Sequence, residues 1–166
     1  QPMPRRCRST TISHRPLTAG EQGLAASVFG NAIDYDRVRF HRRRWWPFQG
    51  RDICMAPDGH LWFHPASPLW REDYASAGLG LQGFFIHEMT HVWQAQSGGR
   101  WYLPLMRHPF CRYDYVLKRG KPFRRYGIEQ QAEIIRHAFL STYGTYPDKI
   151  VNMEDYRCTI PFNLFI

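Results

Sequence analysis

Five consecutive residues near the middle of the chain, His87-Glu88-Met89-Thr90-His91, have the types and the spacing of a zinc site. Two histidines four positions apart on a helix project from the same face, one turn above the other, so both imidazoles can bind one ion. A glutamate directly after the first histidine lies at the edge of that face, where it can act on water as a general base. The motif therefore predicts that His87 and His91 bind Zn²⁺ and that Glu88 is the catalytic base of a zincin-type metallopeptidase.

The residues around the motif argue against a chance occurrence on a surface helix. Phe84-Phe85-Ile86 precede the motif and Val92-Trp93 follow it, so the helix is apolar enough to be buried. Buried ionisable side chains need partners or a metal ion. The context therefore favours the metal site.

A catalytic zinc site has three protein ligands and keeps its fourth position for water, so another residue must contribute. A metzincin would place a glycine and a third histidine shortly after the motif, but Gln94 and Ser97 stand there. We assign Glu129 as the third ligand and Glu133, one turn further along, as the carboxylate that orients a ligating histidine through its free ring N–H. The reversed roles of these two glutamates, or His137 as a ligand, stay open.

Further polar residues are weaker candidates. His60 and His64 would point to one side of a strand, and we expect them at the surface rather than at the metal. Donors that could stabilise a developing oxyanion are Tyr113, Tyr115, Tyr126 and His108, and their spacing does not choose among them.

The elements that must position these residues can be read from apolar spacing and from turn residues. A first helix follows Leu17, with Thr18 and Glu21 as a capping box and Gly30-Asn31 as its end. Alternation over 35–43 predicts a strand, and 52–64 predicts two short strands around the turn Pro57-Asp58-Gly59. We therefore expect a small, mostly antiparallel sheet.

Two longer helices carry the predicted site. Apolar residues at helical spacing from Leu81 to Val92 place the motif in a helix that ends near residues 97–99. A second stripe runs from Ile128 to Phe139 and brings the two glutamates onto a last helix, with Gly144 beyond its end. Together with the sheet, these helices predict a single zincin-like α+β domain over residues 17–166, preceded by an irregular basic arm over residues 1–16.

Length and composition agree with one folded domain. The chain has 166 residues, of which 43% are hydrophobic and 16% aromatic, and this excludes a disordered composition. No stretch approaches the roughly 20 apolar residues that cross a bilayer, so we expect a soluble protein without a membrane span. Residues 1–15 lack the apolar core of a cleavable secretory signal. We expect the bacterial cytoplasm, or export by an injection-type route.

The four cysteines are about fifty residues apart and form no Cys-x-x-Cys pair, which excludes a zinc ribbon. They are Cys7, Cys54, Cys111 and Cys158. A core of this size does not need disulfides, so we expect reduced, mostly buried thiols.

The formal net charge is +8, and much of it is local. Arginines cluster at residues 5–8 and again at residues 37–44. Such a surface attracts anions, whether nucleic acid, phospholipid or an acidic cell-wall polymer, without choosing among them. A solvated basic face without a partner explains the charge equally well.

Two segments of the sequence resemble a known family. Phe85-Ile86-His87-Glu88-Met89-Thr90-His91-Val92-Trp93-Gln94, followed by Glu129-Gln130-Gln131-Ala132-Glu133, is similar to the gluzincin-like peptidase domains that accompany bacterial contractile injection systems. These include Vgr-related proteins of type VI secretion. The runs Arg15-Pro16-Leu17-Thr18 and 29–35 also resemble the opening of such domains, so the likeness covers residues 15–140.

The resemblance implies site residues as well as a fold. Gln94 matches the glutamine that follows the second histidine in these domains, and Glu129, Ala132 and Glu133 match the helix that supplies the third ligand. Glu133 stands where the family commonly has aspartate. The resemblance implies a minimal gluzincin fold and peptidase chemistry with zinc.

Three functions fit these residues. The first is a peptidase that cuts proteins or peptides in connection with a secretion system. The second is a hydrolase of peptidoglycan peptides, to which the positive charge is suited. The third is a non-catalytic zinc-binding adaptor of the secretion machine, whose basic arm binds a component of the machine or nucleic acid. A purely structural site has no need for Glu88, which favours the two enzymes.

Overall fold

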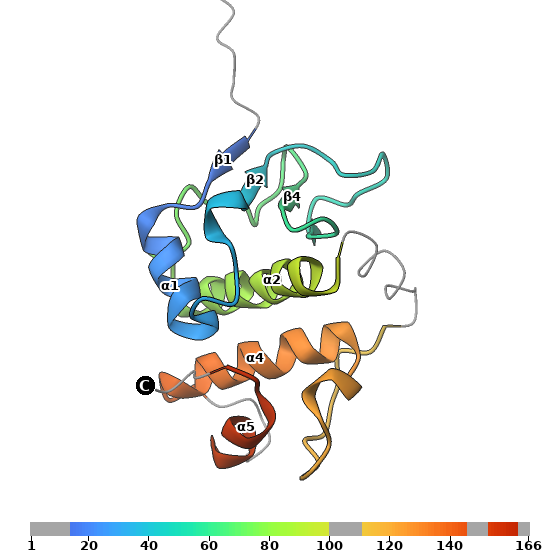
Figure 1. Ribbon diagram of the computed structural model, residues 1–166. Coiled ribbons are helices and arrows are strands. Elements are labelled where there is room, and N and C mark those ends of the chain that lie inside the picture. Colours follow the sequence, from blue (N-terminus) through green and yellow to red (C-terminus); the bar gives the residue numbers. More distant parts are fainter. Residues whose placement is uncertain (1–13, 100–110, 146–152, 163–166) are drawn as a thin grey trace, which may run out of the picture.

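Helix α2 (Leu79–Gly98) runs through the middle of the structure, between a small sheet on one side and helix α4 (Ile128–Thr142) on the other (Figure 1). The computed structural model describes residues 14–99, 111–145 and 153–162. Residues 85–95 of α2 are all buried, because the helix is covered from both sides. An apolar surface nearly all round is what such a position requires. The predicted helix around the motif is therefore confirmed, including its end.

Helices α2 and α4 pack closely against each other. A Cβ atom at Gly83 would lie only 3.0 Å from Cδ2 of Leu140, so the missing side chain allows the close approach. The buried face of α4 contains the predicted apolar stripe from Ile128 to Phe139 together with Glu129. This packing turns the glutamate helix toward the histidine helix.

Helix α1 (Ala19–Phe29) begins with the predicted capping box. The backbone N–H of Glu21 donates to the Thr18 hydroxyl at 3.0 Å, and the Thr18 N–H donates to the Glu21 carboxylate at 2.9 Å. Glu21 is fully buried, and the Arg15 guanidinium donates to both of its carboxylate oxygens, at 2.8 and 2.9 Å. Because the Arg15 guanidinium also lies 4.0 Å from the centroid of the Phe40 ring, this ion pair ties the segment before α1 to the core.

Four short strands form one sheet in the order β1-β2-β4-β3. They are β1 (His14–Pro16), β2 (Arg39–His41), β3 (Cys54–Met55) and β4 (Leu61–Phe63). β1 pairs antiparallel with β2, and β3 with β4, but β2 and β4 are parallel. The expected mostly antiparallel sheet is thus wrong, and the sheet is mixed. Parallel neighbours need a long connection between them. Residues 42–60, which include β3, form this connection, and the turn after β3 then places β4 between β2 and β3.

The boundaries of the predicted arm also need correction. Residues 14–16 are strand β1, so the irregular arm expected over 1–16 is wrong for its last three residues. The remainder, residues 1–13, lies outside the described residues.

Helix α5 (Met153–Thr159), for which the sequence pattern predicted nothing, packs on α4. In the described part of the chain, no helix is both long and apolar enough to cross a membrane.

An aromatic cluster joins the sheet to α2. The rings of Phe40, Tyr74 and Phe85 are fully buried, with centroids 5.5–6.3 Å apart. Such contacts stabilise beyond the burial of their area. The face of α2 opposite α4 is therefore held firmly against the sheet.

The cysteines only partly follow the expectation of buried thiols. Cys54 is buried, Cys111 is half-buried, and Cys158 is exposed. No disulfide joins these three, and Cys7 lies outside the described residues.

Candidate metal centre

Three buried side chains converge between α2 and α4. The ligand atoms of His87, His91 and Glu129 all lie within 4.8 Å of one another. Oε2 of Glu129 is 3.3 Å from Nε2 of His87 and 3.1 Å from Nε2 of His91. The structure therefore brings together the three residues predicted as ligands.

The second ring nitrogen of each histidine is held from outside this group. His87 Nδ1–H donates to Oε1 of Glu133 at 2.7 Å, and His91 Nδ1–H donates to Oε1 of Gln94 at 2.8 Å. These acceptors favour the tautomer with the hydrogen on Nδ1, so each Nε2 presents a lone pair. Two such lone pairs would face the lone pairs of the Glu129 carboxylate, an arrangement that is repulsive unless a proton or a metal ion lies between them. The donor set and its orientation therefore fit a metal ion.

The position of Gln94 is itself fixed by hydrogen bonds. Its Nε2 donates to the backbone oxygen of Ile128 and to the side chain of Gln131, both at 3.0 Å. The amide nitrogen is thereby directed to α4 and the amide oxygen to His91. The three-residue spacing between His91 and Gln94 on a helix is the local signal for this contact.

Glu133 is the centre of a second set of contacts. Besides His87, it accepts hydrogen bonds from Arg136 at 3.3 Å and from Nε2 of His137 at 3.2 Å. Tyr115 in turn lies 2.7 Å from Nδ1 of His137 and can donate its hydroxyl hydrogen to it. His137, which the sequence left open as a ligand, thus contacts Glu133 and lies outside the convergent group.

The electrostatics of the group favour a cation. Burial lowers the pKa of His87, but hydrogen bonds to Glu129 and Glu133 outweigh it and raise the pKa to about 9. Burial also opposes ionisation of Glu129, yet the hydrogen bonds from His87 and His91 hold its pKa well below the ordinary range. Burial likewise opposes ionisation of Glu133, but hydrogen bonds from His137 and His87 hold its pKa well below the ordinary range. Two ionised carboxylates beside two imidazoles attract either protons or a metal ion, which compete for the same lone pairs.

A cavity of about 370 Å³ opens onto this group. Helices α2 and α4 line this cavity, together with residues 52–54 at the start of β3 and Tyr113 from the segment before α4. The lining residues are Asp52, Ile53, Cys54, Phe84, His87, Glu88, His91, Tyr113, Glu129, Glu133 and Arg136. Glu88 is only 7% exposed and lines the same cavity as the three convergent residues. A molecule in the cavity therefore meets a carboxylate and the candidate metal site together.

The other predicted candidates are distributed differently. Among the proposed oxyanion donors, Tyr113 lines the cavity, with its ring centroid 6.5 Å from that of His87. Tyr115 supports His137, and the Tyr126 hydroxyl accepts a hydrogen bond from the backbone N–H of Lys118 at 3.0 Å. His108 lies outside the described residues.

His60 and His64 directly flank β4, and neither belongs to the group that could hold a metal ion. His60 is half-buried, and His64 is only 7% exposed, so the expectation that His64 lies at the surface is wrong. The segment after β2 folds back over this end of the sheet, where Arg44 lies 2.8 Å from His64.

Some cavity residues were not found from the sequence. Arg136 stands three positions after Glu133 on the same helix, and this spacing could have identified it. Asp52 and Ile53 come from the connection between β2 and β3, and no local pattern links them to the histidine helix.

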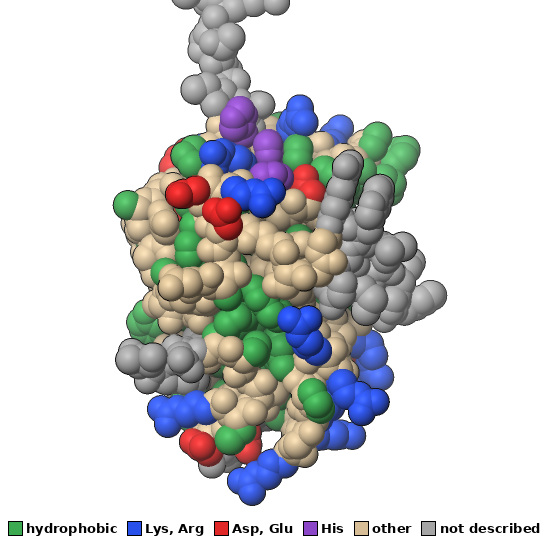
Figure 2. All heavy atoms as spheres, viewed as in Figure 1, with side chains coloured by type: hydrophobic (Ala, Val, Ile, Leu, Met, Phe, Trp, Pro, Cys, Tyr) green, Lys and Arg blue, Asp and Glu red, His purple; other side chains and the backbone are tan. Residues whose placement is uncertain are grey.

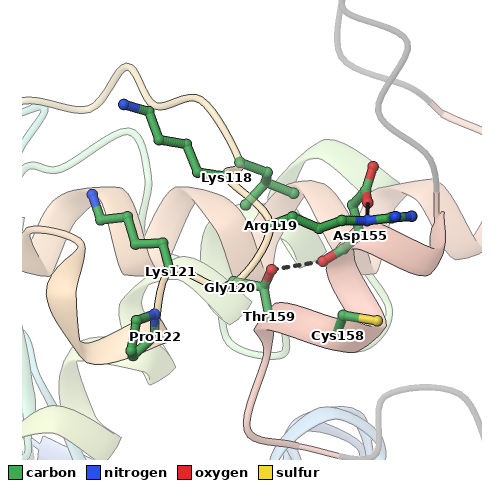
Figure 3. A pocket seen from close by; sticks show the side chains of 9 residues that line it. Lys118, Arg119, Gly120, Lys121, Pro122, Asp155, Cys158 and Thr159 are labelled. Atoms are coloured by element: carbon green, nitrogen blue, oxygen red, sulfur yellow. Dashed lines mark hydrogen bonds and ion pairs between the residues drawn. The ribbon is translucent and has the colours of Figure 1, made fainter.

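A second cavity, of about 390 Å³, lies between the turn at 119–120 and α5 (Figure 3). In Figure 3 the side chains of Lys118 and Lys121 extend away from α5, while Arg119 lies 3.9 Å from Asp155. The cationic groups thus do not converge on one point. No histidine lines this cavity, and the group of described residues that could hold a metal ion does not include any of its lining residues.

The described residues define a class of protein: a small α+β domain in which two packed helices present a buried His-His-Glu group to a cavity. No protein-family model matches the sequence. The chain is similar to the solved effector domain of Pseudomonas aeruginosa VgrG2b, with a TM-score of 0.68 and 40% identity over 78% of this chain and 75% of that one. It therefore belongs to the family of the VgrG2b effector domain.

The full-length spike protein VgrG2b is also similar to this chain. Type VI secretion system spike protein VgrG2b of P. aeruginosa is 42% identical over 132 residues, which are 76% of this chain. The match spans 13% of the spike protein's length.

Proposed function

We propose that this domain is a zinc-dependent peptide-bond hydrolase of the gluzincin type, with a zincin fold. One observation carries the proposal. The Nε2 atoms of His87 and His91 and the carboxylate of Glu129 converge in a buried group, at the wall of a cavity that also contains Glu88.

The donor set favours zinc among the common metal ions. Two imidazole nitrogens and one carboxylate oxygen match the ligands that Zn²⁺ takes in catalytic sites, whereas Ca²⁺ and Mg²⁺ prefer oxygen ligands alone. Three protein ligands leave a fourth position open toward the cavity. A structural zinc site would be closed by a fourth protein ligand.

Zinc held by these residues supplies a Lewis acid that polarises a carbonyl oxygen and acidifies water. Glu88 accepts the proton of the attacking water and returns it to the leaving amine. Glu133 and Gln94 keep both imidazoles in the orientation that binding requires. Tyr113 is the described tyrosine at the cavity wall that can donate a hydrogen bond to the developing oxyanion.

The sheet offers a way to position a peptide. β3 is an edge strand, and its first residue Cys54 lines the cavity together with Ile53. An extended peptide can add to such an edge through backbone hydrogen bonds, which places its scissile bond near the histidines. The substrate is accordingly a protein or peptide.

A role in type VI secretion follows from the relative. VgrG2b is a spike protein of that system, and its effector domain is the part that this chain resembles. We propose that this domain is likewise exported by an injection-type route as part of, or together with, a spike component.

Glu88→Gln tests the chemistry. The amide keeps the shape of the side chain but cannot accept the proton, so turnover of casein should fall by about 10²–10⁴-fold while zinc content is unchanged. Glu154→Gln, an exposed glutamate of α5, is the matched control and should behave like the parent. A Glu88→Gln variant that cuts as fast as the parent would refute the mechanism.

Metal content and substrate choice separate the other functions. Zinc measured by mass spectrometry should be stoichiometric in the parent and lost in Glu129→Ala. Parallel assays with casein and with purified peptidoglycan distinguish a protease from a cell-wall peptide hydrolase. Tightly bound zinc without activity on either would favour the adaptor.

A further inference from the structure

The connection between β2 and β3, residues 42–53, carries the largest exposed apolar side chains of the described chain; we refer to it as the basic-aromatic loop. Phe48 is 80% exposed, Trp46 49%, Ile53 47% and Trp45 43%. The loop projects from the sheet end of the molecule, away from α4 (Figure 1). Large apolar side chains gathered at one place on a surface mark an interaction site.

A buried glutamine holds the base of this loop. Gln49 is 3% exposed, and its Oε1 accepts from the backbone N–H of Trp45 at 2.8 Å. Its Nε2 donates to the backbone oxygens of Ile53 at 2.9 Å and of Trp62 at 2.8 Å. One amide thus joins both ends of the loop to β4. The exposed rings are presented by a defined backbone conformation.

Positive charge surrounds the aromatic tip. The loop contains four exposed arginines and one acidic residue, Asp52; the arginines are Arg42, Arg43, Arg44 and Arg51. Within the described residues, none of these arginines forms an ion pair with a carboxylate. Figure 2, in the same view as Figure 1, shows Lys and Arg side chains beside hydrophobic ones at this end of the molecule. The loop therefore offers apolar and cationic groups to one partner.

The shape of the tip indicates which partner. Small molecules and peptide side chains bind in concave sites, but Trp45, Trp46 and Phe48 line neither of the two cavities described above. Trp46 and Phe48 instead pack on each other, with ring centroids 5.3 Å apart, on a projecting segment. Projecting aromatic rings beside arginines suit the interface of a lipid bilayer, where the rings leave water and the guanidinium groups contact phosphates.

We propose that the basic-aromatic loop binds the surface of an anionic phospholipid bilayer, with Trp46 and Phe48 inserted among the headgroups. Ile53 belongs both to this loop and to the cavity wall. Binding through the loop therefore holds the candidate metal centre close to the bilayer surface, where it faces proteins or peptides at the membrane.

Vesicle binding by the chain itself tests the proposal. The parent should co-sediment with vesicles of phosphatidylglycerol and phosphatidylcholine, weakly with phosphatidylcholine alone, and less as salt increases. In Trp46→Ser/Phe48→Ser the partition coefficient should fall about tenfold or more, because two aromatic side chains no longer leave water. Brominated lipids should quench the tryptophan fluorescence of the parent more than that of the variant.

Matched controls keep the result specific. Tyr143→Ser removes an aromatic side chain that is 59% exposed at the end of α4, and it should bind vesicles like the parent. Circular dichroism and thermal unfolding establish that the loop variant is folded, as expected from the exposure of both side chains.

Three outcomes would overturn the proposal. In the first, the parent shows no preference for phosphatidylglycerol; in the second, the loop variant binds as well as the parent. In the third, the parent fails to bind vesicles while the loop variant loses turnover of casein, which would assign the loop to a protein partner. Vesicle binding does not depend on hydrolysis, so it can succeed or fail independently of the proposed peptidase activity.

Discussion

Glu133 is the residue whose replacement most directly probes how the candidate metal centre is held. Its Oε1 accepts the Nδ1 hydrogen of His87 at 2.7 Å, on the side of the ring opposite Glu129. Glu133→Ala leaves this hydrogen without its acceptor and the ring free to turn. Losing such an orienting carboxylate costs about 10–100-fold in metal affinity, which corresponds to about 1.4–2.7 kcal/mol.

Glu133→Gln separates orientation from charge. The amide keeps an oxygen that can accept from His87, so the zinc affinity of this variant should lie between those of the parent and of Glu133→Ala. His137→Ala removes another partner of Glu133 without touching His87 and serves as the control. Its zinc affinity should stay near that of the parent.

A competition titration with a chromophoric chelator measures these affinities directly. We expect zinc affinity to decrease in the order parent, Glu133→Gln, Glu133→Ala. If Glu133→Ala binds zinc as tightly as the parent, the hydrogen bond to His87 does not position the ligand. If His137→Ala is as weak as Glu133→Ala, the effect comes from general damage to α4.

Three further predictions concern pH and packing. The pKa of His87 in the metal-free protein is raised from 6.5 to about 9, so the stability it contributes is complete below about pH 6.5 and is lost as the pH rises toward 9. Without zinc, thermal unfolding should show this decline, and the stabilisation by added zinc should grow over the same pH range because protons compete less. In Glu129→Ala the decline should be smaller, because one of the two carboxylates that raise the pKa of His87 is gone. Glu21→Ala leaves Arg15 without its buried partner and should lower the free energy of unfolding by about 3 kcal/mol, measured by urea denaturation, with zinc affinity unchanged. Gly83→Val forces apart the two helices and should cost about 1–3 kcal/mol in the same assay, and an unaffected variant would contradict the close approach.

The local parts of the fold could be predicted because neighbouring residues decide them. The capping box of Thr18 and Glu21 specifies the start of α1, and the spacing of His87 and His91 places both imidazoles on one helix face. The turn at 57–59 specifies the hairpin of β3 and β4. Each of these depends on contacts within a few positions along the chain.

Contacts between distant segments were harder to predict. The parallel pairing of β2 and β4 depends on the path of the connection between β2 and β3, and strand periodicity carries no information about that path. The burial of His64 and the exposure of Trp46 and Phe48 depend on the same path. Side-chain hydrophobicity alone would have placed the two aromatic residues inside.

For the candidate metal centre, the sequence by itself determined the ligand types and one helix face: two histidines four residues apart, and Glu129 four residues before Glu133 on another amphipathic helix. Only the tertiary structure decided how these glutamates meet the histidines. Because α2 and α4 pack closely, Glu129 faces both Nε2 atoms and Glu133 reaches the outer nitrogen of His87. Helical spacing makes the two glutamates equivalent, and only the packing of one helix on the other distinguishes the carboxylate inside the group from the one behind it.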